Sequence, residues 1–247
     1  VKTANRLDLL KRKRHTLSLH QHRFRMSMIC YWRLAARTRC RSREVVALNL
    51  NRIESRYFKP WIGSKYDRPG INGKAVLILG ESIYRCDKTS PSRCVDLIES
   101  NCNGVESHKF YTNIYLACMG PDAPRHRENK RAFWERVSFI NFVDDVVEGG
   151  SRHAPGGDSI EKAKRDWKNV LAALEPHLIV VLGRRLWGYL PEPDCESSFA
   201  VEGLDWDPTV KIYEVDGKTS KATYMRHPST GFSSRWWHPV IRSFLKQ

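Results

Sequence analysis

The sequence predicts an α/β fold, a three-layer α/β/α sandwich around a mostly parallel sheet of four strands. Two apolar runs, 75–79 and 178–182, each end at a glycine. Continuous runs of this length are typical of strands that are buried on both faces. Two further strand candidates, 139–143 and 223–225, are separated from these runs by helical patterns. Helices that alternate with buried strands favour a parallel sheet with helices on its faces.

The first half of the pattern begins with a helix. Apolar residues recur at helical spacing over 44–58, and glycine and proline mark 64–73 as a loop. After the first strand, we expect a helix or a helix start at 110–113. A further helix is expected over 128–137, directly before the strand at 139–143.

The second half contains the clearest helix, over 159–174. Asp158 or Ser159 is expected to cap its start, because short polar side chains satisfy the first free N–H groups of a helix. Residues 191–219 are rich in Asp, Glu and Pro and are expected to form a surface excursion or a hairpin. A last helix is expected over 236–245.

Positive charge concentrates near the start of the sequence. The 247 residues carry 42 Lys and Arg against 27 Asp and Glu, and residues 1–45 alone hold 13 of the basic residues and two acids. We therefore expect a basic arm over 1–43 and a single domain over 44–247. Such an arm suits a nucleic-acid backbone. The alternative is an over-extended gene start, since Met26 and Met28 lie inside the arm, and the apolar core of a signal peptide is missing.

Cysteine usage indicates reduced thiols and no metal. The seven cysteines are widely spaced and include no Cys-x-x-Cys pair, which disfavours a zinc site, an iron–sulfur cluster and a disulfide scaffold. We expect no cofactor and no metal. The sequence has no run of the roughly 18 apolar residues that a membrane span needs. These features predict a monomer in a prokaryotic cytoplasm, without a membrane partner.

Polar and aromatic residues follow the predicted strands at their carboxyl ends. The first strand leads into Gly80, Glu81, Ser82, Ile83 and Tyr84. The strand at 139–143 contains Asn141 and leads to Asp144 and Asp145. The last strand leads into His227, Pro228, Ser229, Thr230, Gly231 and Phe232. Ligands of parallel sheets bind at the carboxyl ends of the strands. An acid, an amide and an imidazole are therefore expected to meet at one edge of the sheet, as in an active site.

These segments, in this order, resemble the motifs of the uracil-DNA glycosylase superfamily. That family has a Gly-containing motif that activates water after its first strand, an Asn on a middle strand that recognises the base, and a His-Pro-Ser motif followed by a loop that inserts into DNA. The matching segments here are Gly80 to Tyr84, Asn141, and His227 to Ser229. The resemblance covers residues 57–247. It implies a uracil-DNA glycosylase-like fold and a metal-free enzyme whose partner is DNA.

The first motif departs from the family pattern. The best-known branch has Gly-Gln-Asp-Pro-Tyr, in which the Asp activates water, whereas Ser82 stands at the Asp position here and Ile83 at the Pro position. Glu81 stands at the Gln position, as Glu does in other branches. Tyr84 matches the Tyr that crowds C5 of the pyrimidine. Because the Asp has no counterpart, strict uracil specificity is not implied.

The expected roles follow from the charges that develop when a base–sugar bond breaks. The sugar becomes positive, so Glu81 is the candidate to oppose its charge and orient water, with Ser82 beside it. The base becomes negative, so His227 is the candidate to stabilise it. Asn141 offers a donor and an acceptor to one pyrimidine edge, and Asn113 is its rival. The substrate-binding set is completed by Tyr84, Gly80 and Ile83, and the expected DNA contacts are Ser229, Thr230, Phe232 and Arg235.

Simpler structural roles are open for all of these residues, such as capping a helix or closing a turn. Asp144 and Asp145 are candidate acids, and the expectation for both is that they are solvated loop carboxylates. Trp236 and Trp237 are expected to anchor the last helix in the core.

Three functions are open on this evidence. The first is a DNA glycosylase that hydrolyses the N-glycosidic bond of a flipped-out damaged or modified base. The base would be uracil or a modified pyrimidine, and the role would be base excision repair or antiviral defence against phage DNA. The second is a glycosylase-fold sensor that binds DNA or a base without cutting, which Ser82 supports. The third is a nucleic-acid-binding protein in which the basic arm dominates. An abasic product distinguishes the first from the other two.

Overall fold

The computed structural model describes residues 53, 56–86, 89–105, 108–150, 153–229 and 231–247. The predicted arm at 1–43, the domain boundary after it and most of the predicted helix at 44–58 lie outside these residues. Within that helix, Ile53 is helical, whereas Tyr57 and Phe58 lie in a bend.

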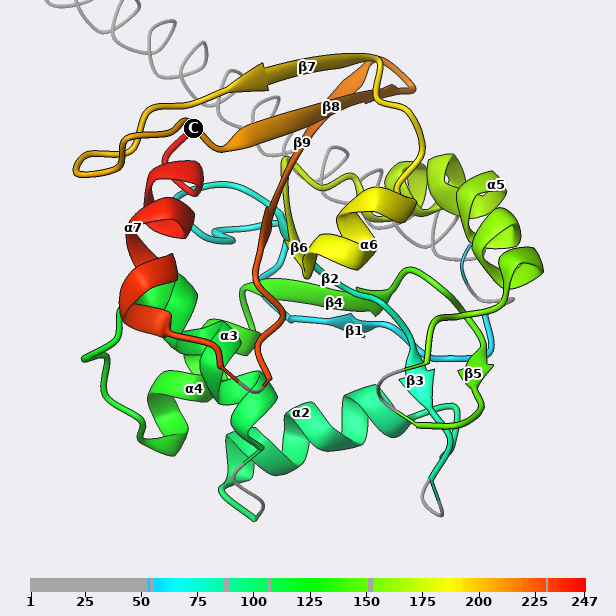
Figure 1. Ribbon diagram of the computed structural model, residues 1–247. Helices are drawn as coiled ribbons and strands as arrows, with labels where there is room; N and C mark the ends of the chain where they lie inside the picture. Colours follow the sequence, from blue (N-terminus) through cyan, green and yellow to red (C-terminus); the bar gives the residue numbers. More distant parts are fainter. Residues whose placement is uncertain (1–52, 54–55, 87–88, 106–107, 151–152, 230) are drawn as a thin grey trace, which may run out of the picture. The chain divides into compact units, whose positions relative to one another are not determined.

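A seven-stranded sheet forms the centre of the fold (Figure 1). Its strand order is β1-β4-β2-β6-β9-β8-β7. The four middle strands run parallel and correspond to the four predicted strands. They are β4 (Val137–Asn141), β2 (Val76–Gly80), β6 (Leu178–Leu182) and β9 (Lys218–Met225). The α/β class with a mostly parallel central sheet is therefore confirmed.

The sheet is larger than the predicted four strands because antiparallel strands extend both edges. β1 (Trp61–Ile62) pairs with β4 at one edge. At the other edge, β8 (Thr209–Val215) pairs with β9, and β7 (Cys195–Ser198) pairs with β8. A separate parallel pair joins β3 (Ile83–Tyr84) to β5 (Val146–Val147).

Alternating side chains explain why the middle strands are apolar throughout. In β2, Val76 and Ile78 belong to one core cluster, while Leu77 and Leu79 belong to the other. All four are fully buried. Because successive side chains of a strand point to opposite faces, a strand with a core on both sides needs apolar residues at every position.

Helices cover both faces of the sheet. One core cluster contains side chains of α2 (Arg93–Asn103), α3 (Lys109–Met119), α4 (Arg127–Trp134) and α7 (Ser234–Phe244). The other contains side chains of α5 (Gly157–Leu174) and α6 (Arg184–Tyr189). In Figure 1, α3 and α7 lie on one side of β2 and β4, and α5 lies on the other.

The start of α5 differs from the prediction. Its N-cap is Gly156, without a side-chain hydrogen bond, and neither Asp158 nor Ser159 caps it. Asp158 lies in the first turn, where a negative charge suits the helix dipole. The Ser159 hydroxyl instead donates to Asp145 Oδ2 at 2.8 Å, so this serine ties the helix to the loop after β4.

The segment 191–219, predicted to be a surface excursion or a hairpin, forms the antiparallel pair β7 and β8 and leads into β9, and all three strands belong to the main sheet. Asp216 and Gly217 form the turn between β8 and β9, with φ values of 51° and 72°. Two successive residues with positive φ match the right-handed twist of a two-residue hairpin, and the Asp-Gly pair favours this turn.

Trp236 corrects the prediction for the last helix. Trp237 is buried as expected, but Trp236 is 47% exposed and stacks on Trp206 at 6.2 Å between ring centroids. Of these two helix neighbours, Trp237 is the one that anchors α7 in the core, because adjacent residues of a helix point in different directions.

Candidate functional site

Gly80 and Asn141 lie side by side at the carboxyl ends of β2 and β4. They are register partners in the parallel pair. A Cβ atom on residue 80 would collide with Asn141 Oδ1 and would lie 3.0 Å from the ring of Phe139. A larger residue here would force the Asn141 amide or the Phe139 ring to move, so glycine is the residue that leaves the amide in place.

The Asn141 amide is directed into the protein. Its Nδ2 donates to Cys94 Sγ of α2 at 3.3 Å, and the side chain is buried. Burial raises the pKa of Cys94 to about 11, while hydrogen bonds from Tyr111 and Asn141 act in the opposite direction. The thiol is therefore a neutral partner near pH 7. The predicted base-recognising amide already has one internal partner.

Glu81 follows Gly80 and is held by Arg185 of α6. Arg185 Nε donates to Glu81 Oε2 at 2.8 Å, and Arg185 Nη2 donates to Oε1 at 2.5 Å. Tyr84 donates its hydroxyl to Oε1 at 3.2 Å and accepts from Arg185 Nη2 at 2.9 Å. Glu81 is buried, whereas the Arg185 side chain is 39% exposed. Two parallel N–H donors fix the orientation of a carboxylate better than a single one.

The same contacts change the acid–base behaviour of the partners. The hydrogen bond to Glu81 raises the pKa of Arg185, and the charge of Glu81 acts in the same direction. Burial raises the pKa of Tyr84, and the nearby Glu81 carboxylate raises it further. Arg185 therefore stays charged and Tyr84 stays a neutral hydroxyl at physiological pH.

His227 lies just beyond β9, where its ring is open to solvent on one side. Its Nδ1 is 2.9 Å from the Ser229 hydroxyl, and its ring centroid is 5.2 Å from that of Phe110. On another side it approaches Gly183, where an added Cβ would lie 3.4 Å from His227 Cβ. The surrounding protein disfavours the imidazolium and lowers the pKa of His227; Glu81 opposes this effect, and Arg185 adds to it.

Glu81, Arg185 and His227 thus form one electrostatic group. They follow β2, β6 and β9, which are adjacent in the sheet, at the same carboxyl edge. The edge predicted from the strand ends therefore holds the acid, the imidazole and the arginine that binds the acid.

Asn113 anchors the loop that contains His227. Its Nδ2 donates to the carbonyl of Pro228 at 3.1 Å, from α3. Asn113, the alternative residue for base recognition, thus has a hydrogen-bond partner in this loop, as Asn141 has one in α2. Of the other predicted loop contacts, Ser229 is exposed, and Thr230 lies outside the described residues.

Ser82 and Ile83 lie deeper than a substrate contact would suggest. The Ser82 hydroxyl is buried at the turn after Glu81. Ile83 belongs to the core cluster beneath α2 and α3, and its strand β3 pairs with β5. Both residues therefore contribute to packing, whatever their role toward a substrate.

The loop carboxylates after β4 are structural and not merely solvated. Asp144 accepts the backbone N–H groups of Tyr57 and Phe58 at 2.7 and 2.9 Å, and lies 3.7 Å from Arg56 Nε. Asp145 accepts from the backbone of Val146 and from Ser159. These bonds fasten the chain before β1 and the start of α5 to the end of β4.

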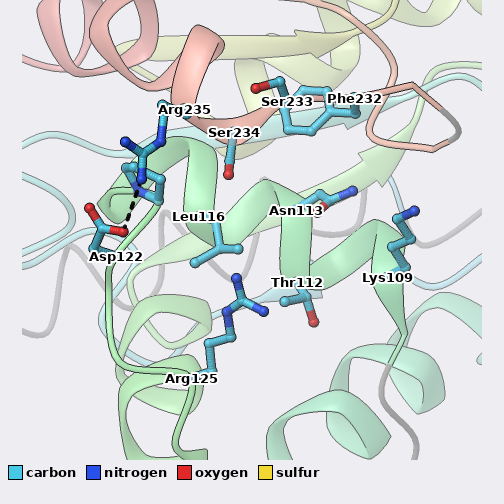
Figure 2. A pocket seen from close by; sticks show the side chains of 11 residues that line it. Lys109, Thr112, Asn113, Leu116, Asp122, Arg125, Phe232, Ser233, Ser234 and Arg235 are labelled. Atoms are coloured by element: carbon cyan, nitrogen blue, oxygen red, sulfur yellow. Dashed lines mark hydrogen bonds and ion pairs between the residues drawn. The ribbon is translucent and has the colours of Figure 1, made fainter.

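A pocket of about 520 Å³ lies between α3, the loop after it and the start of α7. Phe232 and Arg235, both predicted DNA contacts, line it together with Asn113 (Figure 2). Glu81, Asn141 and His227 are not among its lining residues. The pocket is therefore distinct from the edge at which the acid and the imidazole meet.

Sequence reasoning missed Arg185, although a signal for it was present. Strand 178–182 ends at Gly183 as the first strand ends at Gly80, so Arg184 and Arg185 follow a strand at the same edge. No sequence pattern indicated Cys94 as a site residue, because only the tertiary structure brings α2 to Asn141.

Among residues 53, 56–86, 89–105, 108–150, 153–229 and 231–247, no three or more His, Cys, Asp or Glu side chains are grouped as a metal site would require. In the same part of the chain, no helix combines the length and the apolar character needed to cross a bilayer. The chain matches no protein-family model, and a search of curated proteins gives no match.

Proposed function

We propose that the protein is a DNA glycosylase with a uracil-DNA glycosylase-like three-layer sandwich. It would act as a monomer on DNA and hydrolyse the bond between deoxyribose and a flipped-out base, either uracil or a modified pyrimidine. The observation that carries the proposal is that Glu81 and His227 lie at the same carboxyl edge of the parallel sheet, after β2 and β9, and are electrostatically coupled. The order of the motifs along the chain supports the same reaction.

In this proposal, Glu81 opposes the positive charge that develops on the sugar. Its two oxygens are already engaged by Arg185 and Tyr84, so the carboxylate is fixed before substrate arrives. A fixed charge needs no reorganisation during the reaction, which is how electrostatic stabilisation lowers a barrier. Arg185 acts as a positioning residue for Glu81.

His227 stabilises the negative charge on the departing base. In the tautomer in which Nδ1 accepts from the Ser229 hydroxyl, Nε2 carries the proton and donates to a base oxygen. The lowered pKa of His227 keeps this neutral donor form populated at pH 7. Base recognition by Asn141 requires its amide to exchange the Cys94 thiol for the base edge.

The test is incubation of the protein with DNA duplexes and single strands that each carry one modified base, followed by alkali treatment. Wild-type protein is expected to leave alkali-labile abasic sites with at least one of them. Glu81→Gln should reduce the single-turnover rate more than Ser82→Ala, because only a carboxylate opposes the sugar charge. If Ser82→Ala is the more damaging change, the roles of these two residues are wrong.

A second candidate function, a sensor that binds DNA without cutting, is favoured by a specific observation. Two of the polar groups expected to meet substrate already have internal partners, Glu81 with Arg185 and Asn141 with Cys94. Retention of DNA without any abasic product across the panel of bases would support this candidate over the enzyme.

A further inference from the structure

The pocket between α3 and α7 carries more positive than negative charge. Lys109, Arg125 and Arg235 line it, and Asp122 is the acidic residue beside them. Asp122 lies 3.5 Å from Arg235, but both side chains are highly exposed, so this pair contributes little. In the described part of the chain, the side chains of Lys109 and Arg125 form no ion pair or hydrogen bond.

The remaining lining groups are mostly hydrogen-bonding groups rather than an apolar wall. Thr112 and Asn113 come from α3, and Ser233 and Ser234 come from the start of α7. Figure 2 shows Arg125 extending toward the pocket from one side, with the Ser234 hydroxyl directed toward it from the other. Cations of this kind, together with hydroxyls, fit the oxygens of a phosphate group.

The start of α7 adds backbone donors to this set. Ser233 caps the helix by accepting from Trp236 N at 3.3 Å. The N–H groups of Ser234 and Arg235, before Trp236, lie in the part of a helix that has no intrahelical acceptor. These donors and the positive end of the helix dipole favour an anion in the same pocket.

The pocket adjoins the loop that contains His227. Asn113 lines the pocket and also donates to Pro228, the residue after His227. Phe232, on the same loop, lies at the pocket as well (Figure 2). Under the proposed function, a DNA strand whose base reached His227 would pass this loop, and the pocket adjoins the loop.

We infer that this pocket binds a backbone phosphodiester of the DNA strand that carries the target base. The inference rests on the proposed function and adds to it a phosphate site in which Arg125 and Lys109 are the principal cations. The volume of about 520 Å³ exceeds that of a phosphate alone and leaves room for the attached sugar.

The experiment compares Arg125→Gln with Arg165→Gln, an arginine of α5, whose helix packs on the other face of the sheet. Fluorescence anisotropy measures the affinity of full-length protein for a labelled oligonucleotide across a series of salt concentrations. Removing one phosphate contact should make the log–log salt slope shallower by about 0.7 to 0.9 in Arg125→Gln. Lys109→Gln should give a similar change, and Arg165→Gln should match the wild type.

Equal slopes for Arg125→Gln, Lys109→Gln and Arg165→Gln would overturn the inference. The inference would also be overturned if Arg125→Gln weakened the binding of inorganic phosphate but left the binding of DNA unchanged. The excision assay separates the two proposals. If the protein excises a base and the salt slope is unchanged in Arg125→Gln, only the proposal of a phosphate site is contradicted. If the salt slope depends on Arg125 but no abasic product forms, the phosphate site is supported and the proposed glycosylase activity is contradicted.

Discussion

The Glu81 carboxylate has a cation as its partner before any substrate is present. Arg185 holds both of its oxygens, and Tyr84 adds a third donor. A carboxylate bound in this way is fixed in one orientation, and its engaged oxygens are poorly placed to accept a proton from water. This distinguishes the proposed chemistry from that of a site with a free aspartate, and Ser82 stands where the resemblance would require that aspartate.

His227→Ala is expected to lower the single-turnover excision rate about 100- to 1000-fold, because it removes a preorganised donor to the departing base. DNA affinity should change little, since the imidazole is neutral at pH 7 and contributes no phosphate contact. The measurement is product formation with enzyme in excess over labelled DNA. His126→Ala, an exposed histidine at the start of α4, is the matched control and should retain the wild-type rate.

The pKa of His227 offers a test that does not need a substrate. Because partial desolvation by the surrounding protein lowers this pKa, the NMR titration midpoint of the imidazole should lie below the ordinary value of 6.5. Glu81 acts to raise the pKa, so Glu81→Gln should shift the midpoint further down. Excision should fall as pH drops through the midpoint, because protonation of Nδ1 removes the hydrogen bond from Ser229 that orients the ring. An unchanged midpoint in Glu81→Gln would mean that the two groups are not coupled.

The turn after β2 connects local sequence to the geometry of the site. Gly80→Ala should destabilise the protein by about 1 to 3 kcal/mol, because the new Cβ collides with the Asn141 amide and the Phe139 ring. Urea unfolding measures the change. Gly157→Ala, at the first residue of α5, is the matched control, since its Cβ meets no atom within 4 Å. The control should be neutral or slightly stabilising; equal destabilisation in both variants would contradict the role of Gly80.

Burial explains which strands the sequence could predict. β2 and β6 are buried at every position and therefore have continuous apolar runs, and β4 and β9 were predicted beside them. β7 is exposed at every residue and β1 has only two residues, so neither has a distinctive pattern. The Asp216-Gly217 turn was a signal for the β8–β9 hairpin, but nothing local shows that a hairpin joins the main sheet.

The site was predictable where it depends on strand ends and not where it depends on packing between distant elements. Glu81 and His227 could be predicted because parallel strands direct their carboxyl ends to one edge. The contact of Asn141 with Cys94, and that of Asn113 with Pro228, join residues 47 and 115 positions apart. Contacts between residues so far apart in the chain are not predicted by the spacing or periodicity of residues in the sequence.

The charge of the whole chain leads to a prediction for the segment 1–43. The segment 1–45 holds 13 of the 42 Lys and Arg residues, whereas the rest of the chain is nearly balanced. Deleting residues 1–43 should weaken non-specific DNA binding and make its salt slope shallower, by about 0.9 for each phosphate that the segment neutralises. The excision rate at saturating protein should persist. The measurement is anisotropy across salt concentrations; an unchanged slope would mean that the segment does not touch DNA.

The central claim is that the protein breaks a base–sugar bond, and the most direct measurement detects both products of that cleavage. Wild-type protein is incubated with each member of a panel of base-modified DNAs, and mass spectrometry quantifies the released base while alkali cleavage quantifies the abasic sites. The proposal predicts equal amounts of free base and abasic site with at least one DNA, and neither product with Glu81→Gln or His227→Ala above a small fraction of the wild-type amount. DNA that is bound tightly by the wild-type protein but recovered intact from every member of the panel would contradict it.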